Sequence, residues 1–309
     1  MISCLLSIIG WYLLARALYG AYRVIEEIYF IRELDLSSRY GKGSWAFVTG
    51  STDGIGLEFA IQLAKRGFNI VMIARNRQKM NEKEELIKKA NPLVQVQKVE
   101  IDFKDSGDSK NLENIINSVS NLDISIVINN VEVTPAPVLD MSMQTALDMV
   151  VVNCVPQTIF DRLLIPQLAK RDKRSAVVDV SSIASIFPLP GKEIYAGTKQ
   201  YNRYLTNGLS MGVKAPIDFL SLKPAFVTTN LTGQRKEDKI TCNTEECVLG
   251  ALRALGHKTE TYGANKHIVF GTIAQGVLLL LPIEFLMRFR DAIYGVIGYK
   301  AFTNAQTDK

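Results

Sequence analysis

The sequence is poor in the residues that build metal centres, disulfide frameworks and catalytic triads. It has 2 histidines and 4 cysteines among 309 residues. His257 and His267 cannot form a histidine-rich metal site or a Ser-His-Asp triad of obvious spacing. The four cysteines are too few and too scattered for a disulfide framework. We therefore expect chemistry that depends on neither metals nor these triads.

The chain also lacks a strong bias of charge. Its net charge is +5, and no concentrated basic face points to a nucleic-acid partner. Charged residues make up 22%, and a chain of this composition and length buries a full core. The hydrophobic fraction of 47% and the mean hydropathy of +0.09 are slightly high for a soluble enzyme. The sequence therefore contains more apolar residues than the core of a soluble domain of this length would need, and the next question is where they lie.

Part of this surplus lies at the N-terminus. Residues 1–15 contain no charged side chain, and residues 1–22 would span about 33 Å as a helix, near the thickness of a bilayer core. No basic region precedes the run, which favours a retained anchor over a cleaved signal. Arg16, Arg23 and Arg32 follow the uncharged run and place the rest of the chain in the cytosol. A buried or interfacial helix of a soluble domain is the alternative.

A second apolar run covers residues 268–283 and contains Pro282. It is short for a spanning helix, so a monotopic helix or an apolar cap over a substrate channel fits better. Residues 285–302 mix aromatic and basic side chains, as an interfacial helix would. The alternative is an ordinary core helix.

The middle of the chain alternates short β-rich segments with longer helical ones. Such alternation predicts an α/β fold with a doubly wound, Rossmann-like parallel sheet. The predicted strands are 45–49, 69–74, 94–101, 124–128, 176–180 and 217–222. The predicted helices are 56–66, 77–90, 110–120, 155–170 and 196–213. We therefore predict an anchor and linker over 1–42, one α/β domain over 43–266 and a hydrophobic extension over 267–309.

The first predicted strand leads into a glycine-rich turn and then a helix. Gly50, Gly54 and Gly56 let the backbone approach a pyrophosphate, and the helix N-terminus offers free N–H donors. A tight turn without a ligand would be the alternative if the glycines stood alone, but the strand and helix around them supply the confirming context. Ser51, Asp53 and Ile55 lie in the same turn and are predicted to contact the cofactor.

The second strand ends at Arg75 rather than at an acidic residue. An acidic residue here binds a ribose 2′-hydroxyl, whereas an arginine accommodates a 2′-phosphate. The sequence therefore favours NADPH over NADH. The alternative is that Arg75 is a surface charge at the start of a helix.

The strongest constellation of polar residues lies further along the chain. Tyr195 and Lys199 share one face of a predicted helix, and Ser182 precedes the tyrosine by thirteen residues. A nearby ammonium lowers the pKa of a phenol, and a serine hydroxyl can hold a carbonyl oxygen beside it. This combination predicts general acid catalysis matched to hydride delivery from a nicotinamide.

The glycine spacing and the Ser-Tyr-Lys pattern resemble the short-chain dehydrogenase/reductase family. The resemblance implies that Asn153 completes a catalytic tetrad, that Lys199 holds the nicotinamide ribose and that Asp102 contacts the adenine. Family positions predicted to bind the cofactor, in addition to Tyr195 and Lys199, are Asn129, Pro224, Val227 and Thr229.

Two positions depart from the family pattern. The family has Asn-Asn-Ala-Gly after the fourth strand, where this chain has a valine and then Glu132, which puts a carboxylate near the cofactor. The family has Pro-Gly after the sixth strand, where this chain has Pro224 and Ala225. Both departures bear on cofactor binding.

Four segments narrow the resemblance to one branch of the family. Residues 39–50, 52–56, 64–71 and 187–190 look like the microsomal very-long-chain 3-oxoacyl-CoA reductases and the related 17β-hydroxysteroid dehydrogenases of types 3 and 12. That branch has a membrane anchor directly before such a segment. The resemblance implies NADPH-dependent reduction of a 3-oxoacyl-CoA to the 3-hydroxyacyl-CoA during very-long-chain fatty-acid elongation. It also implies the endoplasmic reticulum membrane, with the mitochondrial inner membrane as the alternative.

Two other functions stay open at the level of sequence. The same chemistry could act on a steroid or another lipophilic ketone. In a different class, the chain could be an accessory subunit of a membrane complex that retains the reductase fold, a reading motivated by Glu132 and the apolar termini. A homodimer through the helices beside the active site is usual for the family.

Overall fold

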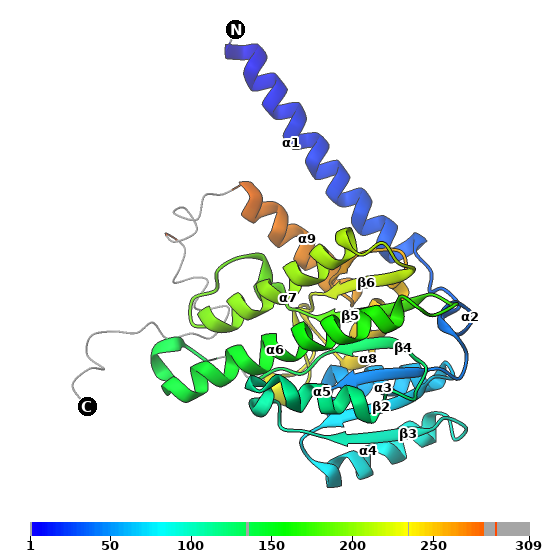
Figure 1. The fold of residues 1–309 in the computed structure, drawn as a ribbon. Coiled ribbons are helices and arrows are strands. Elements are labelled where there is room, and N and C mark those ends of the chain that lie inside the picture. The colour runs from blue at the N-terminus through cyan, green and yellow to red at the C-terminus, as the bar shows by residue number, and fades with distance from the viewer. Residues whose placement is uncertain (1, 134–135, 234, 281–287, 289–309) are drawn as a thin grey trace, which may run out of the picture.

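A sheet of seven parallel strands forms the centre of the molecule (Figure 1). The structure is a computed structural model that describes residues 2–133, 136–233, 235–280 and 288. The strand order is β3-β2-β1-β4-β5-β6-β9, and a separate parallel pair joins β7 to β8. The strands are β1 Trp45–Thr49, β2 Asn69–Ala74, β3 Val96–Glu100, β4 Ile124–Asn129, β5 Ser175–Val180, β6 Ile217–Leu222, β7 Phe226–Val227, β8 Thr241–Cys242 and β9 Glu260–Thr261.

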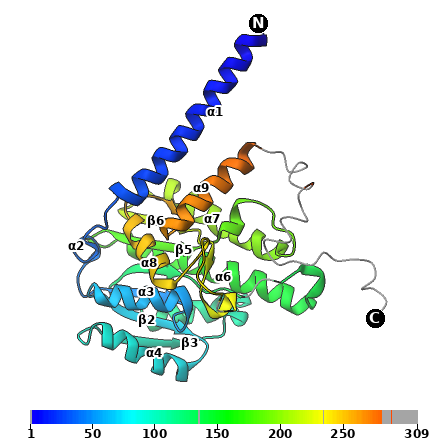
Figure 2. The same ribbon diagram turned by 180° about the vertical axis from the view of Figure 1, so that it is seen from behind.

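Helices cover both faces of this sheet. Helices α3, α4 and α8 pack on one face and α5, α6 and α7 on the other (Figures 1 and 2). The helices are α1 Ile2–Ile25, α2 Leu36–Tyr40, α3 Gly54–Lys65, α4 Arg77–Ala90, α5 Ser109–Ser118, α6 Met143–Leu168, α7 Glu193–Gly212, α8 Thr244–Ala254 and α9 Asn265–Leu280. Short helical turns are Glu26–Phe30, Phe103–Gly107, Val138–Asp140, Ile183–Ile186 and Asn230–Thr232.

The two cores follow from the alternation of side chains along each strand. In β1, Ala46 and Val48 enter the core under α3 and α8, whereas Phe47 enters the core under α5 and α6. The Phe47 ring meets the Phe160 ring of α6 edge to face at 5.0 Å between centroids. Because both faces are covered, the central strands read as continuous apolar runs, which is why the sequence pattern identified them.

The strand order reverses beside β1, which lies between β2 and β4. In open parallel sheets a ligand binds outside the carboxyl ends of the strands at such a reversal. The predicted single α/β domain with a doubly wound sheet is therefore confirmed, and its topology fixes where the site must lie.

The main difference from the predicted elements is the length of α6. It begins at Met143 rather than at residue 155, because Ser142 caps it by accepting a hydrogen bond from the Thr145 backbone N–H at 3.1 Å. Pro156 lies inside the helix. Proline is far commoner in the first turn of a helix, which is why the pattern placed the start too late. The longer helix brings Asn153 into its interior.

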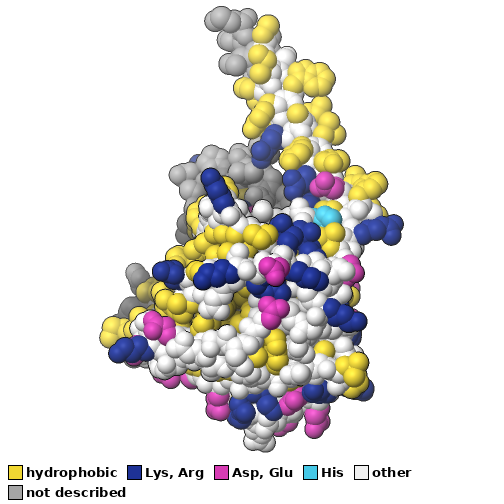
Figure 3. Space-filling view, turned by 45° about the vertical axis from the view of Figure 1, so that its right-hand side comes forward, with side chains coloured by type: hydrophobic (Ala, Val, Ile, Leu, Met, Phe, Trp, Pro, Cys, Tyr) yellow, Lys and Arg dark blue, Asp and Glu magenta, His cyan; other side chains and the backbone are white. Residues whose placement is uncertain are grey.

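Helix α1 projects from the domain and exposes large apolar side chains along its length (Figures 1 and 3). Trp11, Tyr12 and Leu18 are each more than half exposed. The helix is fastened at its base, where the buried Glu27 accepts hydrogen bonds from Lys258 at 2.9 Å and Thr261 at 2.5 Å. An apolar helix that is held to the domain at its C-terminal end, where it also contacts α9, fits the predicted anchor, which stays a prediction.

By length and composition, one helix of the described residues, α6, could cross a membrane. The apolar window of α6 is 44% buried within the protein, as expected of a core helix. The second apolar run forms α9 as far as Leu280, and α9 lies beside α1 (Figure 1). Residues 281–283 of that run, and the predicted interfacial helix 285–302 apart from Arg288, lie outside the described residues.

Candidate active site

A cavity of about 1280 Å³ opens at the carboxyl ends of the parallel strands. Eleven of the predicted site residues line it: Gly50, Asp53, Gly54, Ile55, Arg75, Asp102, Ser182, Tyr195, Pro224, Val227 and Thr229. Five others do not: Ser51, Gly56, Asn129, Asn153 and Lys199. The loops that follow β1 to β6 thus converge on one cavity, as the strand order requires. The five other residues lie behind the residues that line it.

The glycine-rich turn has the shape that the sequence predicts. Gly50 and Gly54 adopt φ angles of 65° and 53°, in the left-handed region that favours glycine. A Cβ atom on Gly56 would lie 2.5 Å from the Gly50 carbonyl oxygen, so only glycine lets α3 start this close to the turn. Asp53 caps α3 by accepting from the Gly54 N–H at 2.8 Å, and the buried Ser51 hydroxyl has no hydrogen-bond partner within the described chain.

The far end of the cavity carries basic side chains from the segments that follow β2 and β3. Arg75 lines this end together with Lys79 and Lys104. Asp102 also lines it, and its carboxylate caps the next helical turn by accepting from the Lys104 N–H at 3.1 Å. Asp102 therefore lines the cavity while its carboxylate caps this turn, and its contact with the adenine stays a prediction.

The loop after β6 closes over the glycine-rich turn. Thr229 packs against Gly54, where an added Cβ would lie 3.0 Å from the threonine methyl group. The next residue, Asn230, donates a hydrogen bond to the Asp53 carboxylate. This contact joins two segments that are 177 residues apart and brings Thr229 to the turn as predicted.

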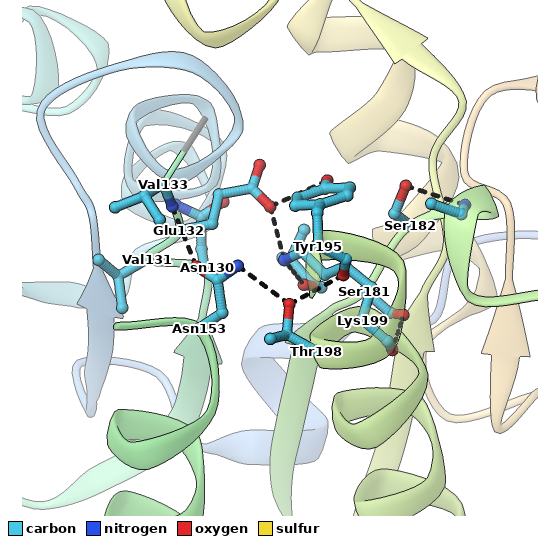
Figure 4. Close-up of polar contacts among 12 residues, drawn as sticks. Asn130, Val131, Glu132, Val133, Asn153, Ser181, Ser182, Tyr195, Thr198 and Lys199 are labelled. Atoms are coloured by element: carbon cyan, nitrogen blue, oxygen red, sulfur yellow. Dashed lines mark hydrogen bonds and ion pairs between the residues drawn. The ribbon is translucent and has the colours of Figure 1, made fainter. Parts of the chain in front are cut away.

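Tyr195 and Lys199 lie one turn apart on α7, next to the end of β5 (Figure 4). The Lys199 side chain is 1% exposed, and its Nζ atom donates to the Val180 carbonyl oxygen at 2.8 Å. The Lys199 Nζ atom lies 5.7 Å from the centroid of the Tyr195 ring. Helical spacing and a strand-end carbonyl thus fix the ammonium behind the phenol.

Ser182 and Asn153 complete the predicted group from two further elements. Ser182 follows β5, and its hydroxyl accepts from the Ala184 N–H at 3.1 Å. Asn153 of α6 is buried, accepts from the Val133 N–H at 3.0 Å and donates to the Thr198 hydroxyl at 3.0 Å. Asn153 therefore braces the loop after β4 against α7 rather than facing the cavity (Figure 4).

Glu132 enters this group directly. Its Oε2 atom lies 2.6 Å from the Lys199 Nζ atom and accepts a hydrogen bond from the Tyr195 hydroxyl at 3.2 Å (Figure 4). The main chain on either side is held, because the Val131 N–H donates to the Thr49 hydroxyl at 3.1 Å and Val133 is bound to Asn153. A loop that ordinarily carries glycine therefore delivers a carboxylate between the tyrosine and the lysine.

This carboxylate reverses the predicted effect on the tyrosine. Burial and the negative charge of Glu132 raise the pKa of Tyr195 well above its usual value, and the hydrogen bond from Ser182 opposes this only in part. The predicted lowering of this pKa by Lys199 is therefore outweighed in the structure. The physical reason is that the phenol is buried and that Glu132 sets a negative charge beside it, and both disfavour a phenolate.

The side chain of Asn129 does not reach the cavity. Its amide donates to the buried carboxylates of Asp161 at 2.9 Å and Asp179 at 2.7 Å, beneath the strand ends. The next residue, Asn130, lines the cavity instead and donates to the Thr49 carbonyl oxygen at 3.1 Å. The alternation of side chains along a strand, carried one residue past the end of β4, could have separated the two asparagines.

The sequence reasoning also missed the residues at the other end of the cavity. This end is apolar and is formed largely by α9 and by the segment that joins the helical turn Ile183–Ile186 to α7: Ala184, Phe187, Leu189, Phe270, Ala274, Val277 and Leu278. Two cations, Lys192 and Arg235, line the same cavity. The prediction of an apolar cap over a substrate channel is consistent with the position of α9. Lys192 could have been noticed as a basic residue three positions before Tyr195.

Comparisons with known proteins place this geometry in a family. Residues 44–240 match the family model described as short chain dehydrogenase. A very-long-chain 3-oxoacyl-CoA reductase of Coccidioides immitis (strain RS) is 30% identical over 80% of this chain and 71% of its own. A Caenorhabditis elegans protein with the provisional name steroid dehydrogenase 1 is 27% identical over 89% of this chain and 88% of its own.

Solved structures agree on the fold. A short-chain dehydrogenase from Sphingobium yanoikuyae in complex with NADPH superimposes with a TM-score of 0.62 at 19% identity, over 77% of this chain and 96% of its own. The chain therefore belongs to the short-chain dehydrogenase/reductase family of oxidoreductases, as the sequence resemblance implied.

Proposed function

We propose that this protein reduces a 3-oxoacyl-CoA to the 3-hydroxyacyl-CoA with NADPH. The observation that carries the proposal is the grouping of Ser182, Tyr195 and Lys199 beside a glycine-rich turn, in a cavity whose other end is apolar. The reductase name of the Coccidioides relative supports the substrate class. The polar end suits a dinucleotide, and the apolar end suits an acyl chain.

The residues of the polar end fit a dinucleotide. The cradle at Gly56 is one that a Cβ atom would fill, and the buried Ser51 hydroxyl lies in the same turn. The absence of an acidic side chain at the end of β2, together with Arg75 and Lys104 on the lining, favours a 2′-phosphate and hence NADPH. When bound, the dinucleotide supplies the hydride.

The chain's own residues would then manage the proton. The Tyr195 hydroxyl would donate its proton to the carbonyl oxygen of the substrate as the hydride arrives, while the Ser182 hydroxyl holds that oxygen. Lys199 would hold the ribose and stabilise the phenolate that remains. Asn153 would keep the loop after β4 and α7 in register through Val133 and Thr198.

The decisive experiment is NADPH oxidation with a 3-oxoacyl-CoA by wild type and Tyr195→Phe. We expect the variant to lose at least about a hundredfold in turnover, because no other group donates the proton. Tyr201→Phe is the matched control: this tyrosine lies on the same helix but bonds Thr158 at 2.7 Å outside the cavity. Equal turnover by wild type and Tyr195→Phe would refute the assignment.

A panel with steroid ketones tests the alternative substrate class, which the apolar lining from α9 also suits.

The second candidate function is that of an accessory subunit without turnover. The observation that favours it is the contact of Glu132 with both Tyr195 and Lys199, the two groups on which the chemistry depends. A purified chain that resides in a stable assembly, binds no NADPH and turns over no ketone would support this candidate against the enzyme.

We further propose that α1 anchors the domain to an intracellular membrane, the endoplasmic reticulum first and the mitochondrial inner membrane second. Its support is the exposed apolar surface of a helix attached to the domain only at its base. The double variant Leu13→Arg, Leu14→Arg should move the protein from the membrane fraction to the soluble fraction. Retention of this variant in carbonate-washed membranes would contradict an anchor made by α1.

A further inference from the structure

A single oxygen atom of Glu132 serves both essential groups of the proposed reaction. Oε2 pairs with the Lys199 Nζ atom at 2.6 Å and accepts from the Tyr195 hydroxyl at 3.2 Å. A second N–H group of the Lys199 ammonium donates a hydrogen bond to the Val180 carbonyl oxygen at 2.8 Å. A ligand hydroxyl that contacts Lys199 and Tyr195 at the same time would take the position that Oε2 now holds.

We propose, resting on the proposed function, that Glu132 is an internal ligand that the dinucleotide has to displace from Lys199 and Tyr195. The displacement is a local event. The Glu132 side chain lines the cavity and is 17% exposed, whereas the main chain around it is held by Thr49 and Asn153. Rotation about the side-chain bonds of Glu132 therefore frees the lysine without moving the loop.

The competition has a measurable size. If the ion pair is closed in nine-tenths or more of the molecules, the apparent affinity for the dinucleotide falls at least about tenfold below its intrinsic value. Glu132→Gln keeps the shape of the side chain and removes its charge, whereas Glu132→Ala also removes the obstruction. We expect both variants to bind NADPH about tenfold or more tightly than wild type, with the larger gain for alanine.

The test is the Kd of NADPH for the full-length protein, measured by calorimetry without a second substrate. Glu84→Gln is the matched control, because Glu84 forms an equally short pair with Lys98 at 2.6 Å outside the cavity. Equal Kd values for wild type and both Glu132 variants would overturn the proposal and leave the proposed function standing. No NADPH binding by any of the proteins would overturn both. Tighter binding by the Glu84→Gln control would overturn the proposal as well, since the gain would not be local.

A second inference rests on the two cations near the apolar end of the cavity. The Lys192 Nζ atom lies 5.6 Å and the Arg235 guanidinium carbon 4.1 Å from the centroid of the Phe226 ring. Arg235 has one ion pair, to Asp238 at 3.5 Å, and no carboxylate of the described chain lies within ion-pair distance of Lys192. Burial and the neighbouring Arg235 lower the pKa of Lys192, as two like charges in a partly buried place should.

We infer that Lys192 and Arg235 form a subsite for the phosphate groups of a coenzyme A thioester, so that the acyl chain extends along α9. This deepens the proposed function, because a steroid offers no anion for these cations. Two cations around one aromatic ring, next to an apolar wall, match a ligand with an anionic head and an apolar tail.

The test compares the Kd values of coenzyme A and of NADPH for wild type and the Lys192→Gln, Arg235→Gln double variant. We expect coenzyme A to bind at least about tenfold more weakly to the double variant and NADPH to bind equally. The double variant Lys170→Gln, Lys214→Gln, at two exposed positions outside the cavity, is the control with the same loss of charge. Unchanged coenzyme A binding would overturn the subsite, and so would an equal loss of NADPH binding. If coenzyme A binding falls as expected but no 3-oxoacyl-CoA is reduced, the subsite stands and the proposed function fails.

Discussion

Lys199 and Lys192 lie seven residues apart around the start of one helix, yet their charges are treated in opposite ways. Lys199 is almost fully buried and is neutralised within the protein by Glu132 at 2.6 Å. Lys192 is half-buried beside Phe226 and has no acidic partner among the described residues. The charge of Lys199 is therefore compensated within the protein, whereas the charge of Lys192 is not compensated and is available to a ligand.

The comparison shows that burial alone does not mark a functional cation. The partner decides, and the partner of Lys199 comes from the loop where this chain departs from its family. In our proposal Lys199 therefore pairs with Glu132 in the free protein and with the dinucleotide in the complex. Lys192 has a partner only when an anionic ligand is bound. The predictions below test this contrast, and the largest effect comes first.

Replacing Lys199 should produce the largest effect. In Lys199→Met we expect turnover to fall at least about a hundredfold, since no cation then holds the phenolate. Stability should fall by about 3 kcal/mol, because Glu132 is left as an uncompensated charge in a poorly solvated place. Urea unfolding of the variant measures the second effect and NADPH oxidation the first.

The double variant Lys199→Met, Glu132→Gln sharpens this prediction. It should recover much of the lost stability, because the unpaired carboxylate is gone, but none of the turnover. A double variant no more stable than Lys199→Met would contradict the view that the pair, rather than the packing of Lys199, supplies the stabilisation.

The pH dependence of reduction is the next effect in size. Reduction needs the phenol of Tyr195 protonated, and its raised pKa keeps it so across the neutral and mildly alkaline range. For wild type we expect kcat/KM for NADPH, which reports the free enzyme, to stay flat between about pH 7 and pH 9. In Glu132→Gln the alkaline fall should move to lower pH, because the charge that disfavours the phenolate is removed.

The kcat profile of wild type adds a test of displacement. If Glu132 leaves when the dinucleotide binds, kcat should begin to fall at a lower pH than kcat/KM does. Profiles of kcat and kcat/KM with the same alkaline limb would mean that Glu132 remains at Tyr195 in the complex.

The fold was predictable from the sequence because its signals are local. Continuous apolar strands, helix-length segments between them and glycines at the first turn together predict a parallel sheet and its ligand edge. The same locality explains the error at α6, because the helix was predicted to begin at residue 155, next to Pro156, whereas the tertiary structure tolerates this proline within the helix. The spacing of Ser182, Tyr195 and Lys199 likewise predicted three residues that lie together in the structure, while their catalytic roles stay predictions.

What the sequence could not predict depends on contacts between distant segments. Glu132 was visible as a departure from the family, but its bond to Lys199 requires the loop after β4 to be held by Thr49 and Asn153. Asn129 and Asn130 are neighbours in sequence, and the alternation of side chains separates them only once β4 is known to continue as far as Asn129. The pairing of Lys192 with Arg235 around Phe226 joins three segments with no common motif.

The smallest effect should come from Lys192 in the free protein. Its pKa is lowered by burial and by Arg235, so the folded state disfavours the charged form relative to the unfolded chain. This charge therefore opposes folding in full at pH values below the lowered pKa, and the cost is lost as the pH rises from the lowered pKa to the ordinary pKa of lysine. Lys192→Gln should therefore leave stability unchanged or raise it by a few tenths of a kcal/mol at about pH 7. A loss of more than about 1 kcal/mol in urea unfolding would mean that Lys192 holds the fold together and is, like Lys199, part of the architecture.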